Sequence, residues 1–204
     1  MLVYMVRHGQ SMGNATNDYS TQQHDRLSPL GWDQARHLVE RLADISFTAI
    51  YASPLRRTVE TIVPLAEARK VTVELWPELC ECCWQEPTAP DRAIGWRNGP
   101  CEDADHIDPA RFRFRDDRAL MPLRTETYAE GLNRVHDVAE LVKRRHVGTQ
   151  DQILMVSHGY FLELLIQELM GYEPRRGFCH ADNTGLTLIQ EHQGAMGIRY
   201  INRC

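Results

Sequence analysis

Two short apolar runs, each followed by a histidine–glycine pair, constrain the fold of this chain more than any other feature. The first run, residues 2–6, leads into Arg7-His8-Gly9, and the second, residues 153–156, precedes His158-Gly159. Runs of this kind are typical of buried strands, and open α/β sheets bind their ligands outside the carboxyl ends of strands. We therefore expect the two histidines to form two halves of one site at one edge of a sheet.

Strand-like and helix-like segments alternate along the remainder of the chain. Helices are expected over 28–42, from 53 to at least 66, over 127–145 and over 161–170, and strands over 47–52, 71–75, 187–190 and 198–201. The polar stretch 11–26 is expected to be a loop. Pro64 is expected to kink or end the second helix, because proline lacks an amide hydrogen and clashes with the preceding turn. The alternation predicts an α/β sheet with helices on both faces.

The composition is that of an ordinary globular domain. The 204 residues are 43% hydrophobic and 25% charged, which suits one domain with a sizeable core. A net charge of -5 gives no reason to expect nucleic acid or an anionic membrane as a partner. The apolar runs are too short for a membrane span or a signal peptide. A cytoplasmic protein with reduced thiols is therefore expected, and its oligomeric state is left open.

One long stretch, residues 77–124, lacks periodicity. It is rich in proline, glycine, arginine and aspartate and includes the segment 111–115, Arg-Phe-Arg-Phe-Arg. Long irregular stretches inside a compact domain usually serve function or are mobile. We expect a single domain, 1–204, in which an irregular insertion at about 82–126 forms a cap over the site.

Three blocks of the chain resemble those of a known family. They are Arg-His-Gly-Gln-Ser-x-x-Asn at 7–14, Ser-Pro-Leu-Arg-Arg-Thr-Val-Glu-Thr at 53–61, and Val-Ser-His-Gly at 156–159. Their order and spacing resemble the histidine phosphatase superfamily, also called the phosphoglycerate mutase-like family, over about 1–81 and 127–190. The resemblance implies a three-layer α/β sandwich with a mostly parallel central sheet, and hydrolysis of phosphate monoesters without a cofactor.

The resemblance gives four residues a role in phosphoryl transfer. His8 is the candidate nucleophile, since a neutral imidazole can attack a phosphoryl group near pH 7 and form a phosphohistidine. Arg7 and Arg57 would hold the phosphoryl oxygens with their planar guanidinium groups. The family spacing selects Arg57 in preference to Arg56. His158, at the start of a helix, would bind the same oxygens together with free backbone N–H groups.

The general acid is assigned by a shorter motif than the other residues. Leu79-Cys80-Glu81 matches a Leu-x-Glu pattern of the family, which implies that Glu81 protonates the leaving oxygen. The residues after it depart from the family context, so Glu78 and Glu86 stay open as alternatives.

Further polar positions complete the candidate substrate-binding set. Ser11 and Asn14 resemble phosphate-neighbouring positions, although turns and helix caps favour the same residue types. Gly159 and Thr184 are also expected near the bound phosphate.

Cys80, Cys82 and Cys83 raise the question of zinc. They do not form a paired Cys-x-x-Cys framework, and a fourth ligand would have to be Cys101 or a distant histidine. We therefore expect buried or incidental thiols, and neither a metal nor a cofactor.

The sequence predicts a phosphatase acting on a small phosphorylated substrate or a phosphopeptide. One alternative is a phosphoglycerate-type mutase. The basic, glycine-rich motif that mutases carry after the acid is absent at 82–88, which argues against it. Another alternative is a scaffold that binds a phosphorylated ligand without turnover.

Overall fold

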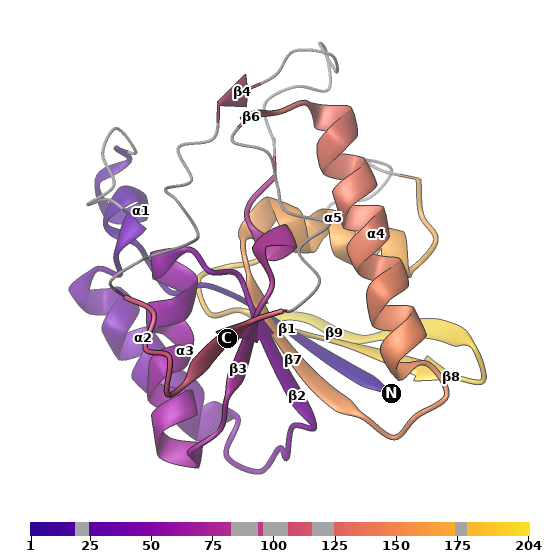
Figure 1. Ribbon diagram of the computed structural model, residues 1–204, viewed down its shortest axis with the longest axis horizontal. Coiled ribbons are helices and arrows are strands. Elements are labelled where there is room, and N and C mark those ends of the chain that lie inside the picture. The colour runs from indigo at the N-terminus through magenta and orange to yellow at the C-terminus, as the bar shows by residue number, and fades with distance from the viewer. Residues whose placement is uncertain (19–24, 83–93, 96–105, 116–124, 174–178) are drawn as a thin grey trace.

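A seven-stranded sheet forms the centre of the structure, a computed structural model that describes residues 1–18, 25–82, 94–95, 106–115, 125–173 and 179–204. Its strands are β1 (Leu2–Arg7), β2 (Ala49–Ala52), β3 (Val73–Leu75), β5 (Phe112–Phe114), β7 (Gln152–Ser157), β8 (Leu186–His192) and β9 (Ala195–Arg203) (Figure 1). They lie in the order β5-β3-β2-β7-β1-β8-β9. Neighbours from β5 to β1 are parallel, whereas β8 is antiparallel to β1 and β9. The predicted mostly parallel sheet is confirmed.

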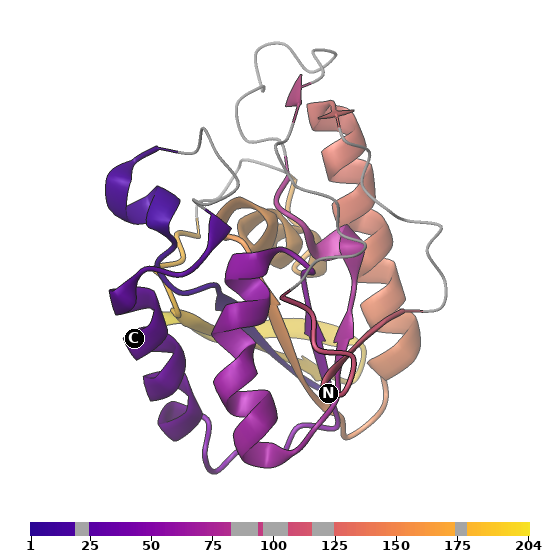
Figure 2. The ribbon, with the colours of Figure 1, turned by 60° about the vertical axis from the view of Figure 1, so that its left-hand side comes forward.

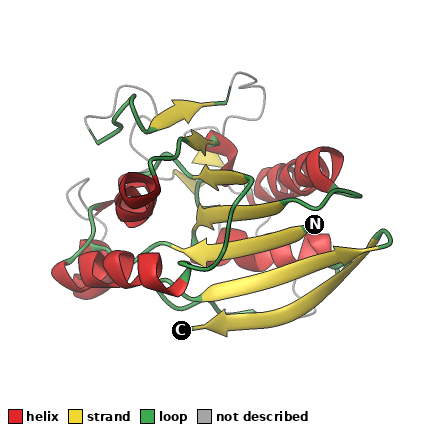
Figure 3. Cartoon of the chain, turned by 90° about the horizontal axis from the view of Figure 1, so that it is seen from below, coloured by secondary structure: helices red, strands yellow, loops and turns green. Residues whose placement is uncertain are grey.

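Helices cover both faces of this sheet. The helices α2 (Pro29–Arg41) and α3 (Arg56–Arg69) lie on one face, and α4 (Tyr128–His146) and α5 (Gly159–Leu169) lie on the other (Figures 1 and 2). Figure 3 shows helices on both sides of the strands. Alternate side chains of each strand point to opposite faces. In β1, Val3 and Met5 pack in the cluster with α4 and α5, and Tyr4 and Val6 pack in the cluster with α2 and α3. The result is the expected three-layer α/β sandwich.

The stretch predicted as a loop contains a short helix, α1 (Met12–Thr16). The Ser11 side chain accepts a hydrogen bond from the Asn14 amide, and the Asn14 side chain accepts one from the Ser11 amide. This reciprocal capping box satisfies two backbone donors at the helix start. The sequence-based prediction of a loop is wrong here, because a five-residue helix is too short to show apolar periodicity.

The α3 helix starts later than predicted, and it does not end at Pro64. It begins at Arg56, two residues after Pro54, and it continues through Pro64 to Arg69. A proline in a helix interior costs about 3 kcal/mol. Ile62 and Leu65 on either side of Pro64 are fully buried, and each such side chain contributes about 1.5–3 kcal/mol by burial. Packing against the sheet therefore outweighs the cost of the proline.

The expected irregular insertion holds more regular structure than its composition indicated. After the 3-10 helix η2 (Pro77–Leu79), a strand β4 (Ile94–Gly95) pairs with β6 (Thr125–Glu126). The segment Phe112–Phe114 forms the edge strand β5 beside β3. Phe112 is buried in the core while Arg113 is exposed, so this arginine-rich segment has the two-residue period of a strand. This strand was missed in the sequence analysis because its arginines indicated irregular structure.

The carboxyl ends of the parallel strands determine where the candidate residues meet. Arg7 and His8 follow β1, Ser53 follows β2, and His158 follows β7. The β3 strand leads into η2 and then Glu81. These residues therefore gather at one edge of the sheet, as predicted from the two histidine–glycine pairs. Within the described residues, no helix is both long enough and apolar enough to cross a membrane.

Candidate active site

His8 is held in one tautomer at the end of β1. Its Nδ1 lies 2.7 Å from the carbonyl oxygen of Gly9. A carbonyl can only accept, so Nδ1 carries the hydrogen and Nε2 carries the lone pair. The residue is 4% exposed. Burial, and then the charges of Arg57 and Arg7, hold its pKa well below 6.5. His8 is therefore neutral, and its lone pair is on Nε2.

Arg57, in the first turn of α3, is the arginine that contacts His8. Its Nε donates to His8 Nε2 over 3.1 Å, and its Nη1 forms an ion pair with Asp25. Asp25 also accepts a hydrogen bond from the Arg56 amide at 2.9 Å. The Arg56 side chain binds Glu60 instead, with Nε and Oε1 2.7 Å apart. The structure thus separates the two neighbouring arginines, and Asp25 is a site residue that the sequence analysis missed.

His158 lies beside His8, with ring centroids 5.3 Å apart. It is 0% exposed, and its Nε2 lies 2.9 Å from the Ser53 hydroxyl. Its Nδ1 has no hydrogen-bond partner among the described residues. Burial, followed by the charges of Arg57, His8 and Arg7, holds the pKa of His158 well below 6.5. A neutral His158 therefore keeps one ring nitrogen for a ligand.

Arg7 occupies the space beside Gly159. Its Nη1 donates to the Ala181 carbonyl over 2.7 Å. A Cβ on residue 159 would lie 3.4 Å from Arg7 Nε and 3.5 Å from its Cδ. These are ordinary van der Waals distances, so Gly159 packs against the Arg7 side chain without excluding a methyl group.

Glu81 lies at the amino end of α5. Its Oε1 accepts from the amides of Phe161 (2.8 Å) and Cys82 (3.1 Å), and its Oε2 accepts from Tyr160 (3.4 Å). Burial raises the pKa of this carboxyl above its ordinary 4.5, although the Phe161 amide and the Arg57 charge oppose the shift. A carboxyl group that retains its proton is suited to general acid chemistry. The expectation that the amides at this helix start would be free for phosphate is wrong for Tyr160 and Phe161, because Glu81 binds them.

The two alternatives for the acid have different positions. Glu78 is fully buried and forms an ion pair with Arg115, which follows β5 and is also buried. This pair ties the end of β5 to η2. Glu86 lies outside the described residues.

Asn14 and Thr184 lie in a network of hydrogen bonds around the backbone of Arg7 and His8. Asn14, besides capping α1, accepts from Asn183 Nδ2 at 3.3 Å, and the same nitrogen donates to the His8 carbonyl at 2.9 Å. The Thr184 amide donates to the Arg7 carbonyl at 3.0 Å, while its hydroxyl donates to the Asn183 carbonyl at 2.7 Å. Asn183 is the more direct support of His8, and sequence reasoning did not single it out.

The cysteines do not form a recognisable metal site in the described part of the chain. No group of three or more histidine, cysteine, aspartate or glutamate side chains is placed there to hold a metal ion. Cys80 and Cys82 are buried, and Cys80 Sγ lies 3.6 Å from the Ser53 hydroxyl. Cys83 and Cys101 lie outside the described residues.

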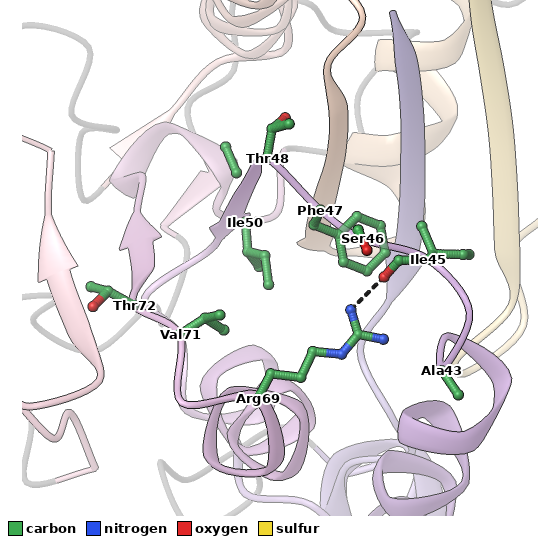
Figure 4. A pocket seen from close by; sticks show the side chains of 10 residues that line it. Ala43, Ile45, Ser46, Phe47, Thr48, Ile50, Arg69, Val71 and Thr72 are labelled. Atoms are coloured by element: carbon green, nitrogen blue, oxygen red, sulfur yellow. Dashed lines mark hydrogen bonds between the residues drawn. The ribbon is translucent and has the colours of Figure 1, made fainter.

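A pocket of about 530 Å³ lies at the opposite end of the sheet, near the amino ends of β2 and β3 (Figure 4). Its charged group is Arg69, whose Nη1 donates to the Ile45 carbonyl over 2.6 Å. The lining contains no histidine, cysteine or carboxylate. This hollow therefore lacks the groups for phosphoryl transfer that meet at the other edge.

Comparison with known proteins identifies the family. Residues 3–203 match the histidine phosphatase superfamily (branch 1). The adenosylcobalamin/alpha-ribazole phosphatase of Escherichia coli (strain K12) is 27% identical over 207 residues, covering 99% of this chain and 96% of that protein. The "Probable phosphoglycerate mutase GpmB" of Enterobacter sp. (strain 638) is 29% identical over 187 residues, covering 85% and 78%. The alpha-ribazole phosphatase structure from Shigella flexneri shares the fold, with a TM-score of 0.72, 24% identity, and coverage of 100% and 96%.

The fold and the facing histidines define an α/β enzyme of phosphoryl transfer. The chain belongs to the histidine phosphatase superfamily, and the predicted resemblance is confirmed. With phosphatases among its relatives, it is a phosphoric monoester hydrolase of the histidine phosphatase type.

Proposed function

We propose that the chain hydrolyses small phosphate monoesters in two steps through a phosphohistidine on His8. The observation that carries this proposal is the tautomer of His8, whose Nδ1 is bound to a carbonyl and whose Nε2 lone pair faces Arg57. In the first step, Nε2 attacks phosphorus, the bond to the leaving oxygen breaks, and Glu81 gives that oxygen its proton. In the second step, water attacks the phosphohistidine, Glu81 accepts a proton from the water, and inorganic phosphate leaves.

Arg7, Arg57 and His158 hold the transferring phosphoryl group. Its charge is spread over three oxygens, so catalysis depends on positioning and electrostatic stabilisation. His8 Nε2 must be free for attack, so its 3.1 Å contact with Arg57 has to open. The same N–H of Arg57 can then donate to a phosphoryl oxygen. If the Ser53 hydroxyl donates to His158 Nε2, the Nδ1 hydrogen is available for another oxygen.

Two observations favour hydrolysis over the alternatives. The basic, glycine-rich motif of the mutases is absent at 82–88, so a tight clamp on a phosphorylated intermediate has no support in the sequence. Burial raises the pKa of Glu81 above its ordinary value, which suits a general acid and disfavours a scaffold without turnover. Relatives named for alpha-ribazole and for phosphoglycerate support a small phosphate ester in preference to a phosphopeptide.

The proposal includes the organisation and location of the protein. Residues 1–204 would form one catalytic domain, with the insertion at about 82–126 as a cap, because the insertion leaves directly after Glu81 and ends at Glu126. We also propose a cytoplasmic location, in which the cysteines stay reduced.

The test is covalent trapping on His8. Brief reaction with a ³²P-labelled phosphate ester and quenching at alkaline pH should leave acid-labile label on His8. His8→Ala should lose at least about a thousandfold in kcat with p-nitrophenyl phosphate, because the nucleophile is gone. His37→Ala is the matched control, since His37 is exposed on α2 with its side chain 68% accessible. Full turnover by His8→Ala, or label on another residue, would disprove the proposal.

A mutase is recognised in the same assay. Phosphoglycerate supplied as acceptor should leave phosphate release unchanged in a phosphatase. Transfer of the label to phosphoglycerate in place of water would assign the mutase activity.

A further inference from the structure

Arg134 of α4 is a buried arginine whose five N–H groups all have partners. Its Nε and Nη2 bind the two carboxylate oxygens of Glu126, each at 2.7 Å. Its Nη1 donates to the carbonyls of Glu78 (2.6 Å) and Cys80 (2.8 Å), and Nη2 also donates to that of Glu81 (3.2 Å). The residue is only 6% exposed. One planar group therefore connects α4 and β6 to the acid loop, which we define as residues 78–81.

The three carbonyls fix the path of the acid loop. They come from nearby positions and converge on one guanidinium, whose donor geometry is rigid. On the other side of the loop, the Glu81 carboxylate is bound to the amides at the start of α5. The backbone of Glu81 is thus held by Arg134 and its side chain by α5. Displacement of the loop would move the carboxyl relative to His8.

Stability alone gives a poor account of this arrangement. A buried ion pair contributes little net stability, because desolvating two charges offsets their attraction. A well-packed apolar side chain at 134 would serve the core equally well, given that the guanidinium already lies over the Phe161 ring at 5.3 Å. Such a side chain could not bind three carbonyls. The distinctive property of Arg134 is therefore the geometry that it gives to the acid loop.

We infer that Arg134 is a positioning residue for the general acid: it places Glu81 for protonation of the leaving oxygen, and Glu126 holds Arg134 in turn. The inference rests on the proposed function, in which Glu81 is that acid. Arg134 itself does not touch the reacting groups. Its effect reaches the chemistry through the loop carbonyls.

The experiment compares esters that differ in their need for an acid. p-Nitrophenyl phosphate has a good leaving group that departs without a proton, whereas an alkyl phosphate does not. Arg134→Lys keeps the charge but cannot make five directed bonds. It should lower kcat/KM, which reports formation of the phosphohistidine before Glu81 acts as a base, by about 10- to 100-fold on the alkyl phosphate, as for a reacting group displaced by 1 Å. On p-nitrophenyl phosphate the loss in kcat/KM should stay within about threefold.

Two further variants make the result decisive. Glu126→Gln should give the same pattern more weakly, and it decides the question if Arg134→Lys does not fold. In the Glu81→Gln background, Arg134→Lys should add no further loss on the alkyl phosphate, because both changes remove the same proton transfer. Arg145→Lys is the matched control, since Arg145 lies on the same helix but binds Glu74.

The outcomes separate this inference from the proposed function. Equal losses on the two esters, or a fully additive double variant, would overturn the positioning role. If Glu81→Gln shows the leaving-group pattern and neither Arg134→Lys nor Glu126→Gln does, only the inference fails. If Glu81→Gln lacks the pattern, or wild type releases no phosphate from either ester, the proposed function fails.

Discussion

Replacement of Gly31 by alanine should damage both stability and catalysis, because Gly31 packs directly on the loop that carries His8. A Cβ on residue 31 would lie 2.1 Å from the Gln10 carbonyl oxygen. On the other side of this contact, a Cβ on Gly9 would lie 2.8 Å from the Gly31 oxygen. The backbones of α2 and of the loop that carries His8 thus meet without space for a methyl group.

The magnitude follows from the displacement that alanine requires. Ordinary contact begins at 3.4 Å, so α2 and the loop must separate by about 1.3 Å from the 2.1 Å position. Overpacking of this kind costs about 1–3 kcal/mol. The 2.8 Å bond from the Ser28 amide to the Gln10 carbonyl and its neighbours would weaken, which costs about 1–2 kcal/mol more. Alanine regains about 1 kcal/mol of helix propensity.

The net loss is therefore about 1–4 kcal/mol, which lowers Tm by roughly 2–16 °C in a chain of this size. Because the displacement exceeds 1 Å at a residue two positions from His8, kcat/KM should fall about 100-fold. Gly197→Ala is the matched control, since its Cβ would meet only the Gln190 oxygen at 3.9 Å. Melting curves and p-nitrophenyl phosphate kinetics measure both effects. A Gly31→Ala protein that melts and turns over like Gly197→Ala would refute the argument.

Three other predictions concern charge. EDTA should leave turnover within about twofold, because guanidinium groups neutralise the phosphoryl charge; a loss that zinc restores would contradict this. His8 and His158 have pKa values held below 6.5, so the stability they contribute is present above pH 6.5 and is lost as pH falls below it. Below pH 6.5, each histidine should lower the free energy of unfolding by up to about 1.4 kcal/mol per pH unit. The Tm of His158→Gln should therefore depend less steeply on pH than that of wild type. Equal slopes of Tm against pH would count against buried neutral imidazoles. Asp25→Asn should lower kcat/KM about tenfold on aryl and alkyl phosphates alike, because Arg57 loses a charge-assisted bond; an effect confined to alkyl phosphates would assign Asp25 to the acid instead.

The elements with strong local patterns could be predicted from the sequence. Apolar runs identified β1 and β7, and the histidine–glycine pairs after them located the site, because parallel strands present their carboxyl ends at one edge. A capping serine and a proline marked the start of α2. The family pattern selected Arg57 over Arg56, and the structure places Arg57 against His8.

Features that depend on distant contacts could not be predicted in this way. Asp25 and Arg134 are single polar residues in the sequence, and their importance comes from partners 32 and 56 positions away. Glu78 and Glu81 are only three positions apart in the sequence. Only tertiary packing gives one a buried arginine partner and the other the start of α5. Pro64 is the opposite case. Proline usually ends a helix, but α3 continues through it because the residues around it pack in the core.

The attachment of the insertion to the sheet has a consequence for how enzymes of this kind diverge. Three contacts attach the insertion to the rest of the chain. They are the ion pair of Glu78 with Arg115, the pairing of β5 with β3, and the ion pair of Glu126 with Arg134. Sequence changes that keep these three contacts should leave Glu81 in place. The phosphoryl chemistry can then be inherited unchanged on the sheet while other parts of the chain diverge.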